Sequence, residues 1–500
     1  MRRATFPLAR DVGKGMSSIG NRTAILTLSR LANYGLMLIS PILLVRLLDV
    51  EAFGRYREFL LYASILQSLA VFSINDSVLY CVPANPASPW RVARQTAVLT
   101  FCSSALVMVA LIALDTATGG KVVDGYLLPL VAYTMLSVNL DFWEFFWLAN
   151  RRPGAVFVYS ASRLIVRVSV AVATAALTHD VGTIIWALVV LEGVRLVAAG
   201  FAFAALDRSR HEPVLAEPWR DQLRFCIPSG IASLLAMLNR NLSSLAVARM
   251  LGPVALAQYA IGRFGEPVVV TVRNSVSSVV LPEMVRKDRQ SRESPLTLWK
   301  KATVVNTIFL FPVVVLVARY AHPLVTTVFG QSYSQAALVM QIYMLVVIRE
   351  CFDFAPALRA INRTRPLVES NVAAVVACGI ALWVLIPVAG VAGAMVAFVI
   401  ASFIDVSWLG WRTMKLYGVS GREILPWASI GKTALAAISA AAIIVSPIWT
   451  QMLGFAGVIL GSAAYGAAFA LILLMLRVPE AIVLLEWSKR LLPVHTTRKV

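Results

Sequence analysis

Long apolar segments follow one another along almost the entire chain. A helix needs about twenty mainly apolar residues to cross a membrane, and fourteen segments of the sequence meet that requirement. Short turns rich in proline and glycine separate them, and alternating ten-residue strands are missing. The sequence therefore predicts an all-α membrane protein with about fourteen transmembrane helices, at residues 22–48, 55–82, 91–114, 124–148, 155–178, 181–206, 222–248, 256–283, 299–320, 334–358, 366–388, 391–414, 428–449 and 453–477.

The composition and the rare residue types exclude several other classes of protein. Hydrophobic residues make up 59% of the chain and charged residues only 14%, whereas a soluble domain is about one quarter charged. Five scattered cysteines without a C-x-x-C motif, and four histidines in loops or the tail, provide no metal site. The chain has neither a nucleotide-binding G-x-x-x-x-G-K-[ST] motif nor an H-E-x-x-H motif. We therefore expect no cofactor, no metal and no enzymatic activity.

Basic residues concentrate in the loops on one side of the expected helices. The connections on the N-terminal side carry most of the arginines and lysines, while the opposite side offers little beyond Arg55, Lys121 and Arg319. Because positively charged short loops face the cytoplasm, we expect both termini to lie there. The same distribution accounts for the net charge of +19, so nucleic acid is not an expected partner. We expect the basic loops to contact membrane lipids instead.

A short sequence phrase occurs twice, at the end of the first and of the seventh apolar segment. In Val45–Tyr56 and Ala248–Tyr259, an arginine, two apolar residues and a turn precede a tyrosine at one constant offset. Six segments separate the copies, and because six is even both copies have the same orientation in the membrane. We therefore expect two six-helix lobes, at residues 1–210 and 211–415, related by a pseudo-twofold axis along the membrane normal. Residues 416–500 would add two helices and an amphipathic cytoplasmic tail.

Several arginines fall inside the expected helices, where an ionisable side chain normally faces a cavity or the bundle interior. Arg163 and Arg167 lie one turn apart on one helix face, and such a pair of like charges destabilises an isolated helix. An anion, or an acidic side chain from another helix, would remove that penalty. Arginine binds phosphate oxygens through paired hydrogen bonds. We therefore predict a cavity for a phosphorylated substrate, lined by Arg163, Arg167 and Arg240, with Arg30 and Arg273 assisting.

Acidic side chains at membrane depth have two interpretations. Asp141 and Glu144 lie on one helix face beside aromatic residues, and Glu266 and Asp353 fall inside later segments. These acids could couple transport to a cation or a proton, or they could be charge partners of the arginines. For Asp141 and Glu144 we favour partnership with the arginines of segment 155–178.

Two acid–arginine pairs lie within single expected helices. Glu192 and Arg195 are three residues apart, and Arg349 and Asp353 are four residues apart, so the members of each pair are neighbours on a helix surface. Each pair could simply neutralise itself and hold adjacent helices together.

The phrase at the end of the first segment resembles that of the bacterial polysaccharide flippases of the multidrug/oligosaccharidyl-lipid/polysaccharide exporter superfamily. It comprises Leu44, Arg46, Leu48, Phe53, Gly54 and Tyr56, and the family's second half is resembled by Leu251, Gly252, Tyr259 and Val280–Pro282. The resemblance implies two lobes around a cavity that opens alternately to either side of the bacterial cytoplasmic membrane. It also implies a substrate in which an oligosaccharide is joined through pyrophosphate to a polyprenyl lipid, for O-antigen or exopolysaccharide assembly. A polysaccharide polymerase and chain-length machinery would be its partners.

Two alternatives to a flippase differ in what they require of the sequence. A multidrug or small-solute exporter of the same superfamily often uses an acid in the first span, but residues 22–48 contain none and hold Arg30 instead. A polytopic polymerase or ligase would need a large outer loop with catalytic groups. The longest outer loop, near 320–334, has only His322 and no acid. Both features favour the flippase.

Overall fold

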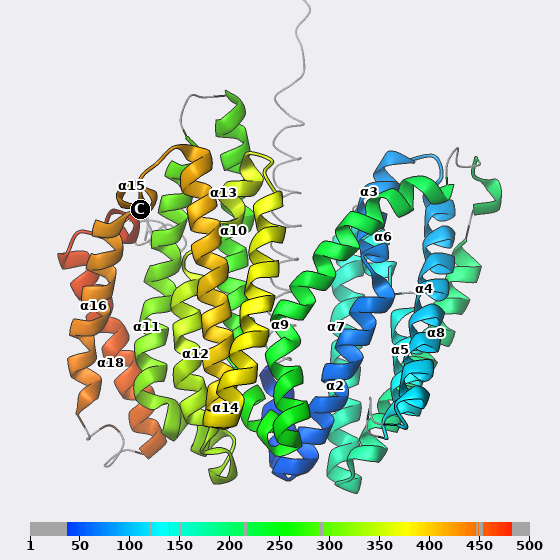
Figure 1. The fold of residues 1–500 in the computed structure, drawn as a ribbon, viewed down its shortest axis with the longest axis horizontal. Helices are drawn as coiled ribbons and strands as arrows, with labels where there is room; N and C mark the ends of the chain where they lie inside the picture. Colours follow the sequence, from blue (N-terminus) through cyan, green and yellow to red (C-terminus); the bar gives the residue numbers. More distant parts are fainter. Residues whose placement is uncertain are drawn as a thin grey trace, which may run out of the picture. The chain divides into compact units, whose positions relative to one another are not determined.

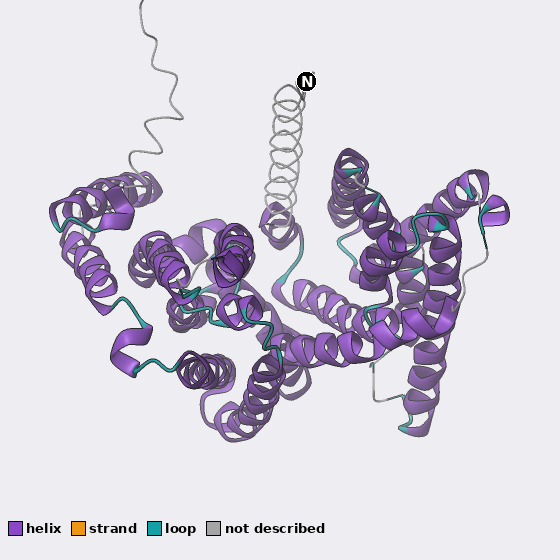
Figure 2. Ribbon diagram, turned by 90° about the horizontal axis from the view of Figure 1, so that it is seen from above, coloured by secondary structure: helices purple, strands orange, loops and turns teal. Residues whose placement is uncertain are grey.

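The computed structural model describes residues 38–482, except for 121–122, 124, 140, 151, 208, 214–217, 291–293, 447–448 and 450–453. Every regular element in the described part of the chain is a helix (Figure 2). The chain divides into two compact units, Met1–Asn241 and Leu242–Val500. Helix α9 contains the point of division, and each unit is described below by itself. The lobe boundaries and the pseudo-twofold axis expected from the sequence remain predictions, because each unit is described separately.

The first unit is built from a helix at Leu38–Leu47 and from helices that mostly follow one another as antiparallel neighbours (Figure 1). Helix α8 packs against α5 and α7, and α2 packs against α4 and α5. The short helix α6 packs against α3 and α7. The elements are α2 (Val50–Val71), α3 (Ile74–Ala84), α4 (Pro89–Ala117), α5 (Leu127–Val138), α6 (Trp143–Ala149), α7 (Pro153–Thr178), α8 (Val181–Leu206), η1 (Ser209–His211) and α9 (Pro218–Gly262).

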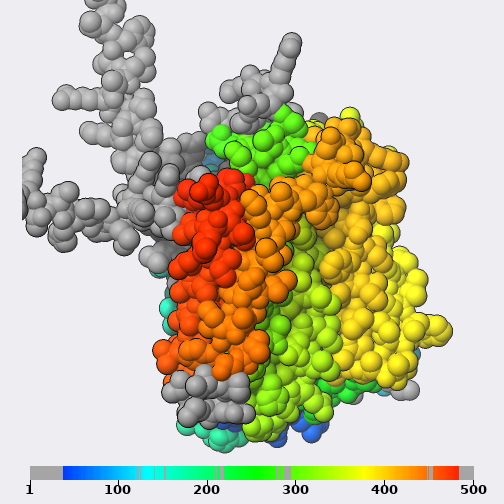
Figure 3. All heavy atoms as spheres, turned by 90° about the vertical axis from the view of Figure 1, so that its left-hand side faces the viewer, coloured from blue at the N-terminus to red at the C-terminus, as the bar shows by residue number. Residues whose placement is uncertain are grey.

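The second unit centres on α11, which packs against α10, α12 and α16. Helices α16 and α18 pack together, and their side chains form one apolar core with α11 around Tyr465 and Phe469. Figure 3 shows the orange and red surface of these two helices beside the light-green surface of α11. The elements are α10 (Glu266–Gln290), α11 (Leu296–Val328), η2 (Gln331–Tyr333), α12 (Ala336–Glu350), α13 (Ala355–Ala360), α14 (Arg365–Tyr417), α15 (Gly421–Ile424), α16 (Trp427–Val445) and α18 (Gly454–Met475).

The described residues include nine helices that are long and apolar enough to cross a membrane, so the chain is a multi-pass membrane protein. Helix α8 has the bounds predicted from the sequence, and α4, α7, α16 and α18 lie within a few residues of theirs. Helix α14 contains both predicted segments 366–388 and 391–414, joined through Gly390, whose φ is 53°. The described part of predicted segment 22–48 is the helix Leu38–Leu47, and most of the predicted amphipathic tail lies outside the described residues.

Four segments predicted as continuous helices are broken in the structure. Segment 55–82 forms α2 and α3, with Phe72 and Ser73 in the left-handed conformation between them. The other three broken segments are 124–148, 256–283 and 334–358, which form α5 with α6, the end of α9 with α10, and α12 with α13. Within a membrane, non-helical backbone is tolerated where it is buried in protein or lines a cavity. These breaks are therefore the first places to look for function.

The turn between α7 and α8 contains an N-cap residue whose contribution to stability can be measured. Asp180 is the N-cap of α8 and accepts hydrogen bonds from the Thr183 backbone N–H and hydroxyl, both at 2.7 Å. Replacing an N-cap aspartate by alanine costs about 1 kcal/mol of stability, so we expect Asp180→Ala to lower the melting temperature of the purified protein slightly. Asp180→Asn, which keeps the cap oxygen, is the matched control and should lose less.

The same cap predicts the direction of a pH effect. The hydrogen bonds from Thr183 hold the pKa of Asp180 below its ordinary value. A carboxyl whose pKa is lowered by folding stabilises the protein above its unfolded-state pKa, and this contribution is lost as the pH falls through the folded-state pKa. The stability difference between the wild type and Asp180→Ala should therefore shrink in acid. A difference that stays constant down to about pH 3 would contradict the cap.

Candidate functional site

The break between α5 and α6 holds a charged residue against two helices. Asp141 lies in this break, and its Oδ1 accepts hydrogen bonds from Nη1 of Arg163 on α7 at 2.6 Å and from Nη1 of Arg195 on α8 at 3.1 Å. Arg195 Nε also donates to Glu192 Oε2 at 2.5 Å, while Arg163 Nη2 lies 4.0 Å from Glu192 Oε1. We call Asp141, Arg163, Glu192 and Arg195 the Asp141 cluster.

Arg195 also binds the broken backbone. Its Nη2 donates to the carbonyl oxygen of Ser137 at 2.6 Å, in the last turn of α5, and its Nη1 donates to the Tyr159 hydroxyl at 2.7 Å. The last carbonyls of a helix have no partner within the helix, so the guanidinium replaces the hydrogen bonds that the break removes. Arg195 thus joins three helices, which explains how an irregular segment persists among apolar residues.

Phe142, which follows Asp141, anchors the break from the other side. Its ring is completely buried and stacks on Trp143 with centroids 5.9 Å apart. Both belong to an apolar core formed by α3, α4 and α6, which also includes Phe146. The Asp–Phe pair therefore turns a carboxylate toward the arginines and an aromatic ring into the core.

Arg167 lies one turn beyond Arg163 on α7. Its guanidinium carbon is 5.8 Å from the centroid of the Tyr133 ring, a distance that allows a cation–π contact. Among the described residues, no carboxylate lies within ion-pair distance of Arg167. Arg167 is thus a cation that sits beside the Asp141 cluster without sharing its acids.

The remaining predicted residues of the first unit are Arg240, Glu144 and Arg30. Arg240 is on α9 with an exposed side chain, and Glu144 is in the first turn of α6, where no ion pair forms to another described residue. The expectation that Glu144 would partner the α7 arginines is therefore not met, because only Asp141 lies in the break itself. Arg30 lies outside the described residues.

A second charged cluster occupies the break between α12 and α13. Arg273 of α10 donates from Nη1 to Glu350 Oε2 at 2.5 Å, and its Nε lies 3.7 Å from Asp353 Oδ2. Arg349 Nη1 binds Glu350 Oε1 at 2.8 Å, and Arg349 also pairs with Asp405 of α14. We call Arg273, Arg349, Glu350, Asp353 and Asp405 the Glu350 cluster.

Arg349 does not form the ion pair with Asp353 that their spacing predicts; its ion-pair partners are Glu350 and Asp405. Asp353 lies beyond the end of α12, so the four-residue spacing of a continuous helix does not apply to it. Its carboxylate instead accepts from the Ala355 N–H at 3.0 Å, and its carbonyl accepts from Trp299 Nε1 at 2.6 Å. Phe354 stacks on Trp299 with centroids 4.5 Å apart, so this Asp–Phe pair is placed like the one at Asp141.

The break between α9 and α10 contains an ion pair whose arginine is buried. Arg263 donates from Nε and Nη2 to the two carboxylate oxygens of Glu266, each at 3.0 Å. Its guanidinium carbon also lies 4.4 Å from the centroid of the Phe398 ring on α14. Arg263 is only 9% exposed, so Glu266 compensates a charge that the surroundings would otherwise destabilise.

The break between α2 and α3 packs against α9 in the same unit. The hydroxyl groups of Ser73 and Ser233 lie 2.9 Å apart, and the Phe72 ring fits over Gly230, where an added Cβ would be 2.6 Å from ring atoms. We therefore expect Gly230→Ala to displace this ring and to cost about 1–3 kcal/mol of stability. The shift of the melting temperature in detergent measures this loss of stability. Gly379→Ala, at a helical glycine with open space around it, should show no such loss; equal effects would contradict the packing.

The sequence predicts Arg163, Arg273, Asp141 and Asp353 as site residues. It does not predict Arg195, Glu350 and Asp405 as site residues, although the structure gives them comparable contacts and the spacing places Arg195 beside Glu192. A second internal repeat could have located both breaks. Residues 141–153 and 353–366 each begin with Asp–Phe, have Asn–Arg nine residues later and end in Arg–Pro.

The comparisons with known proteins identify the fold. The lipid II flippase MurJ in an inward closed conformation is similar with a TM-score of 0.63 and 12% identity, over 90% of this chain and 100% of that one. An inward-facing multidrug resistance MATE family transporter of the MOP superfamily is similar with a TM-score of 0.53 and 14% identity, over 78% of this chain and 96% of that one. The chain therefore has the two-lobed helical fold of these transporters.

A family model described as "Polysaccharide biosynthesis protein" matches residues 152–338, less than half of the chain. No curated protein matches the sequence. The matched region extends from the start of α7 into the first turn of α12 and therefore includes Arg163, Arg167, Arg195 and Arg273. Over this region the chain is therefore similar to that family.

Proposed function

We propose that the protein is a flippase that moves a polyprenyl-pyrophosphate-linked oligosaccharide across the bacterial cytoplasmic membrane for surface polysaccharide assembly. The observation that carries this proposal is the placement of arginine clusters at helix breaks in a chain with a lipid-flippase fold. Transporters commonly bind their substrates at discontinuous membrane helices. The polysaccharide family match favours a sugar-bearing cargo.

The pyrophosphate would be bound by Arg167 first. Arg167 has no carboxylate partner among the described residues and lies beside Arg163, whose partner Asp141 is one quarter exposed. An arriving pyrophosphate could therefore compete with Asp141 for Arg163 while it binds Arg167, because charge-assisted bonds to either anion have the same geometry. Arg240, Arg30 and Arg273 remain proposed contributors.

The acids have a matching role in this proposal. When a substrate anion takes over an arginine, the carboxylate left behind loses its ion pair. Asp141 and Asp353, at the helix breaks, would then be the sites of ion coupling, with Glu144 and Glu266 as further candidates. Such an exchange would couple a gradient to transport by alternating access. The termini would be cytoplasmic, with polymerase and chain-length machinery as partners.

Reconstitution tests the transport step directly. The purified protein is placed in vesicles that contain a short-chain polyprenyl pyrophosphate carrying a fluorescent oligosaccharide, and dithionite is added outside. Without transport, dithionite bleaches only the outer leaflet; with the flippase, the inner pool should also be bleached. Labelled phosphatidylcholine is the control and should stay protected inside. Equal bleaching of both lipids, or no bleaching beyond the outer leaflet, would contradict the proposal.

A drug exporter is the second candidate, because the multidrug transporter shares the fold. It predicts that cells lacking the protein become sensitive to cationic drugs while their lipid-linked sugar pool is unchanged.

A further inference from the structure

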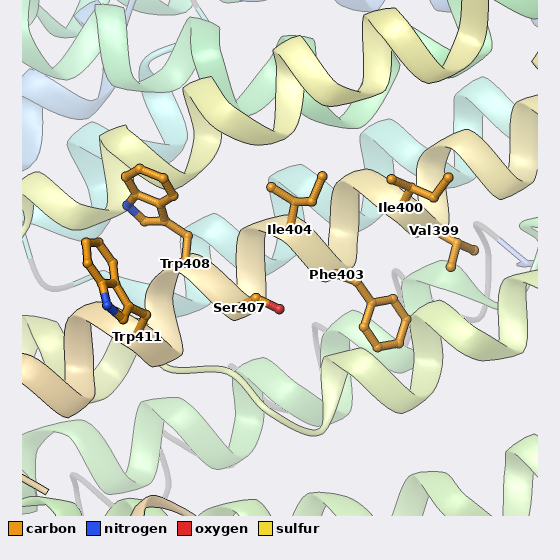
Figure 4. Close-up of a pocket in the computed structure, with 7 residues that line it drawn as sticks. All are labelled: Val399, Ile400, Phe403, Ile404, Ser407, Trp408 and Trp411. Atoms are coloured by element: carbon orange, nitrogen blue, oxygen red, sulfur yellow. The ribbon is translucent and has the colours of Figure 1, made fainter. Parts of the chain in front are cut away.

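The second half of α14 has one buried and one open face. Asp405, Leu409 and Thr413 are buried, and Asp405 pairs with Arg349 of α12. The open face forms a groove of about 690 Å³ whose lining runs from Val399 to Trp411 (Figure 4). The Glu350 cluster does not use this face.

The groove is mostly apolar, with Ser407 as its polar lining residue, and it is aromatic at one end. Ile400, Ile404 and Trp408 recur at intervals of four residues, which places them in one row on the helix. Phe403 extends beside them and is 40% exposed. Trp408 and Trp411 meet edge to face with ring centroids 5.6 Å apart. An apolar row that ends in tryptophans is typical of the boundary between hydrocarbon and headgroups.

Cations gather beyond the tryptophans. The Lys415 ammonium lies 4.1 Å from the centroid of the Trp411 ring, and the Arg412 guanidinium carbon lies 5.7 Å from it. Glu369 accepts from Arg412 at 3.1 Å and from Trp408 Nε1 at 3.4 Å, and so fixes both side chains. Arg365 also contacts Glu369 at 3.3 Å, so two arginines share one carboxylate.

The arrangement leaves hydrogen-bonding capacity for an anion. The Arg412 side chain is 31% exposed, so an anion outside the helix can reach part of it. Lys415 is exposed and has the Trp411 ring as its printed contact. Because the groove is mostly apolar and adjacent to excess positive charge, its occupant must combine a hydrocarbon chain with an anionic head.

We infer that this groove binds one anionic phospholipid, with an acyl chain along Ile400, Phe403 and Ile404 and its phosphate at Arg412 and Lys415. Trp408 and Trp411 lie between the two parts of the lipid. The site is on the open face of α14 and uses none of the residues proposed for the transported substrate. It would bind a membrane lipid as a resident and not as cargo.

Thermal unfolding of the full chain in detergent tests the inference. Phosphatidylglycerol and phosphatidylcholine with identical acyl chains are titrated separately, and the melting temperature is recorded at each concentration. We expect phosphatidylglycerol to raise it more. In the double variant Arg412→Gln/Lys415→Gln, the phosphatidylglycerol concentration that gives half of the stabilisation should increase about tenfold. Each cation near a lipid surface adds to the attraction for an anionic lipid. Arg422→Gln, at an exposed cation outside the groove, should leave this concentration unchanged.

Further measurements distinguish the contribution of the lipid headgroup from that of its acyl chains. Phe403→Ala, at an exposed position, should also weaken the phosphatidylglycerol effect, whereas glycerol phosphate without acyl chains should not reproduce it. Equal stabilisation by the two phospholipids would overturn the inference. So would an equal response of the groove variant and Arg422→Gln, full stabilisation by glycerol phosphate, or an unchanged response in Phe403→Ala.

Discussion

Replacing Arg195 by methionine is expected to destabilise the protein more than any other single change to the Asp141 cluster. The substitution leaves Glu192, which is 2% exposed, without its 2.5 Å partner, and it removes the hydrogen bond to the Ser137 carbonyl. Breaking a buried ion pair by removing one member costs about 3–5 kcal/mol. The measurement is the fraction of folded protein by size-exclusion chromatography, together with the melting temperature.

Two variants show whether that loss arises from the unpaired charge. Glu192→Gln combined with Arg195→Met removes the lone carboxylate and should recover part of the stability. Arg55→Met breaks the exposed pair with Glu51, in which both side chains are more than half exposed, and should cost less than about 1 kcal/mol. If Arg195→Met and Arg55→Met had equal effects, the Asp141 cluster would not be the structural anchor described above.

Replacing Arg167 by alanine is expected to reduce transport strongly while the fold stays intact. Arg167 contacts the Tyr133 ring and shares no carboxylate among the described residues, so its removal leaves no acid unpaired. Hydrogen bonds to charged groups contribute about 1.5–3 kcal/mol each, so the initial rate in the vesicle assay should fall by roughly tenfold to a hundredfold.

Two further variants show whether the loss of transport is specific to the guanidinium group of Arg167. Arg167→Lys keeps the charge but loses the paired donors that fit a phosphate, and should have an intermediate rate. Arg94→Ala removes an exposed arginine of α4 in the same unit and should transport normally. A normal rate in Arg167→Ala, with the melting temperature unchanged, would remove Arg167 from the binding site.

The hydropathy pattern predicts much of the fold because a helix in lipid must be apolar over its whole length. This reasoning gives α8 at its observed bounds and α14 with its turn at Gly390. It does not reveal the breaks, because hydropathy stays high across them. The carbonyl freed at Ser137 is satisfied by Arg195 from another helix, and local periodicity contains no information about such a distant partner.

The candidate site was predictable to a smaller extent for the same reason. Helical spacing correctly places Glu192 beside Arg195, since α8 is continuous there. The same spacing fails for Arg349, because α12 ends at Glu350 and the partner on α14 is 56 residues away. Charge pairs within intact helices can be read from spacing, whereas those at breaks depend on tertiary packing.

The most direct test of the proposed function is the pool of lipid-linked sugars in a strain that lacks the protein. If the protein is the proposed flippase, a polyprenyl-pyrophosphate oligosaccharide accumulates on the cytoplasmic leaflet and surface polysaccharide is lost. Wild-type protein should restore both, and Arg167→Ala should not. An unchanged pool with altered drug sensitivity would contradict the flippase and favour an exporter. Single repeat units delivered outside but left unpolymerised would also contradict it and indicate a polymerase.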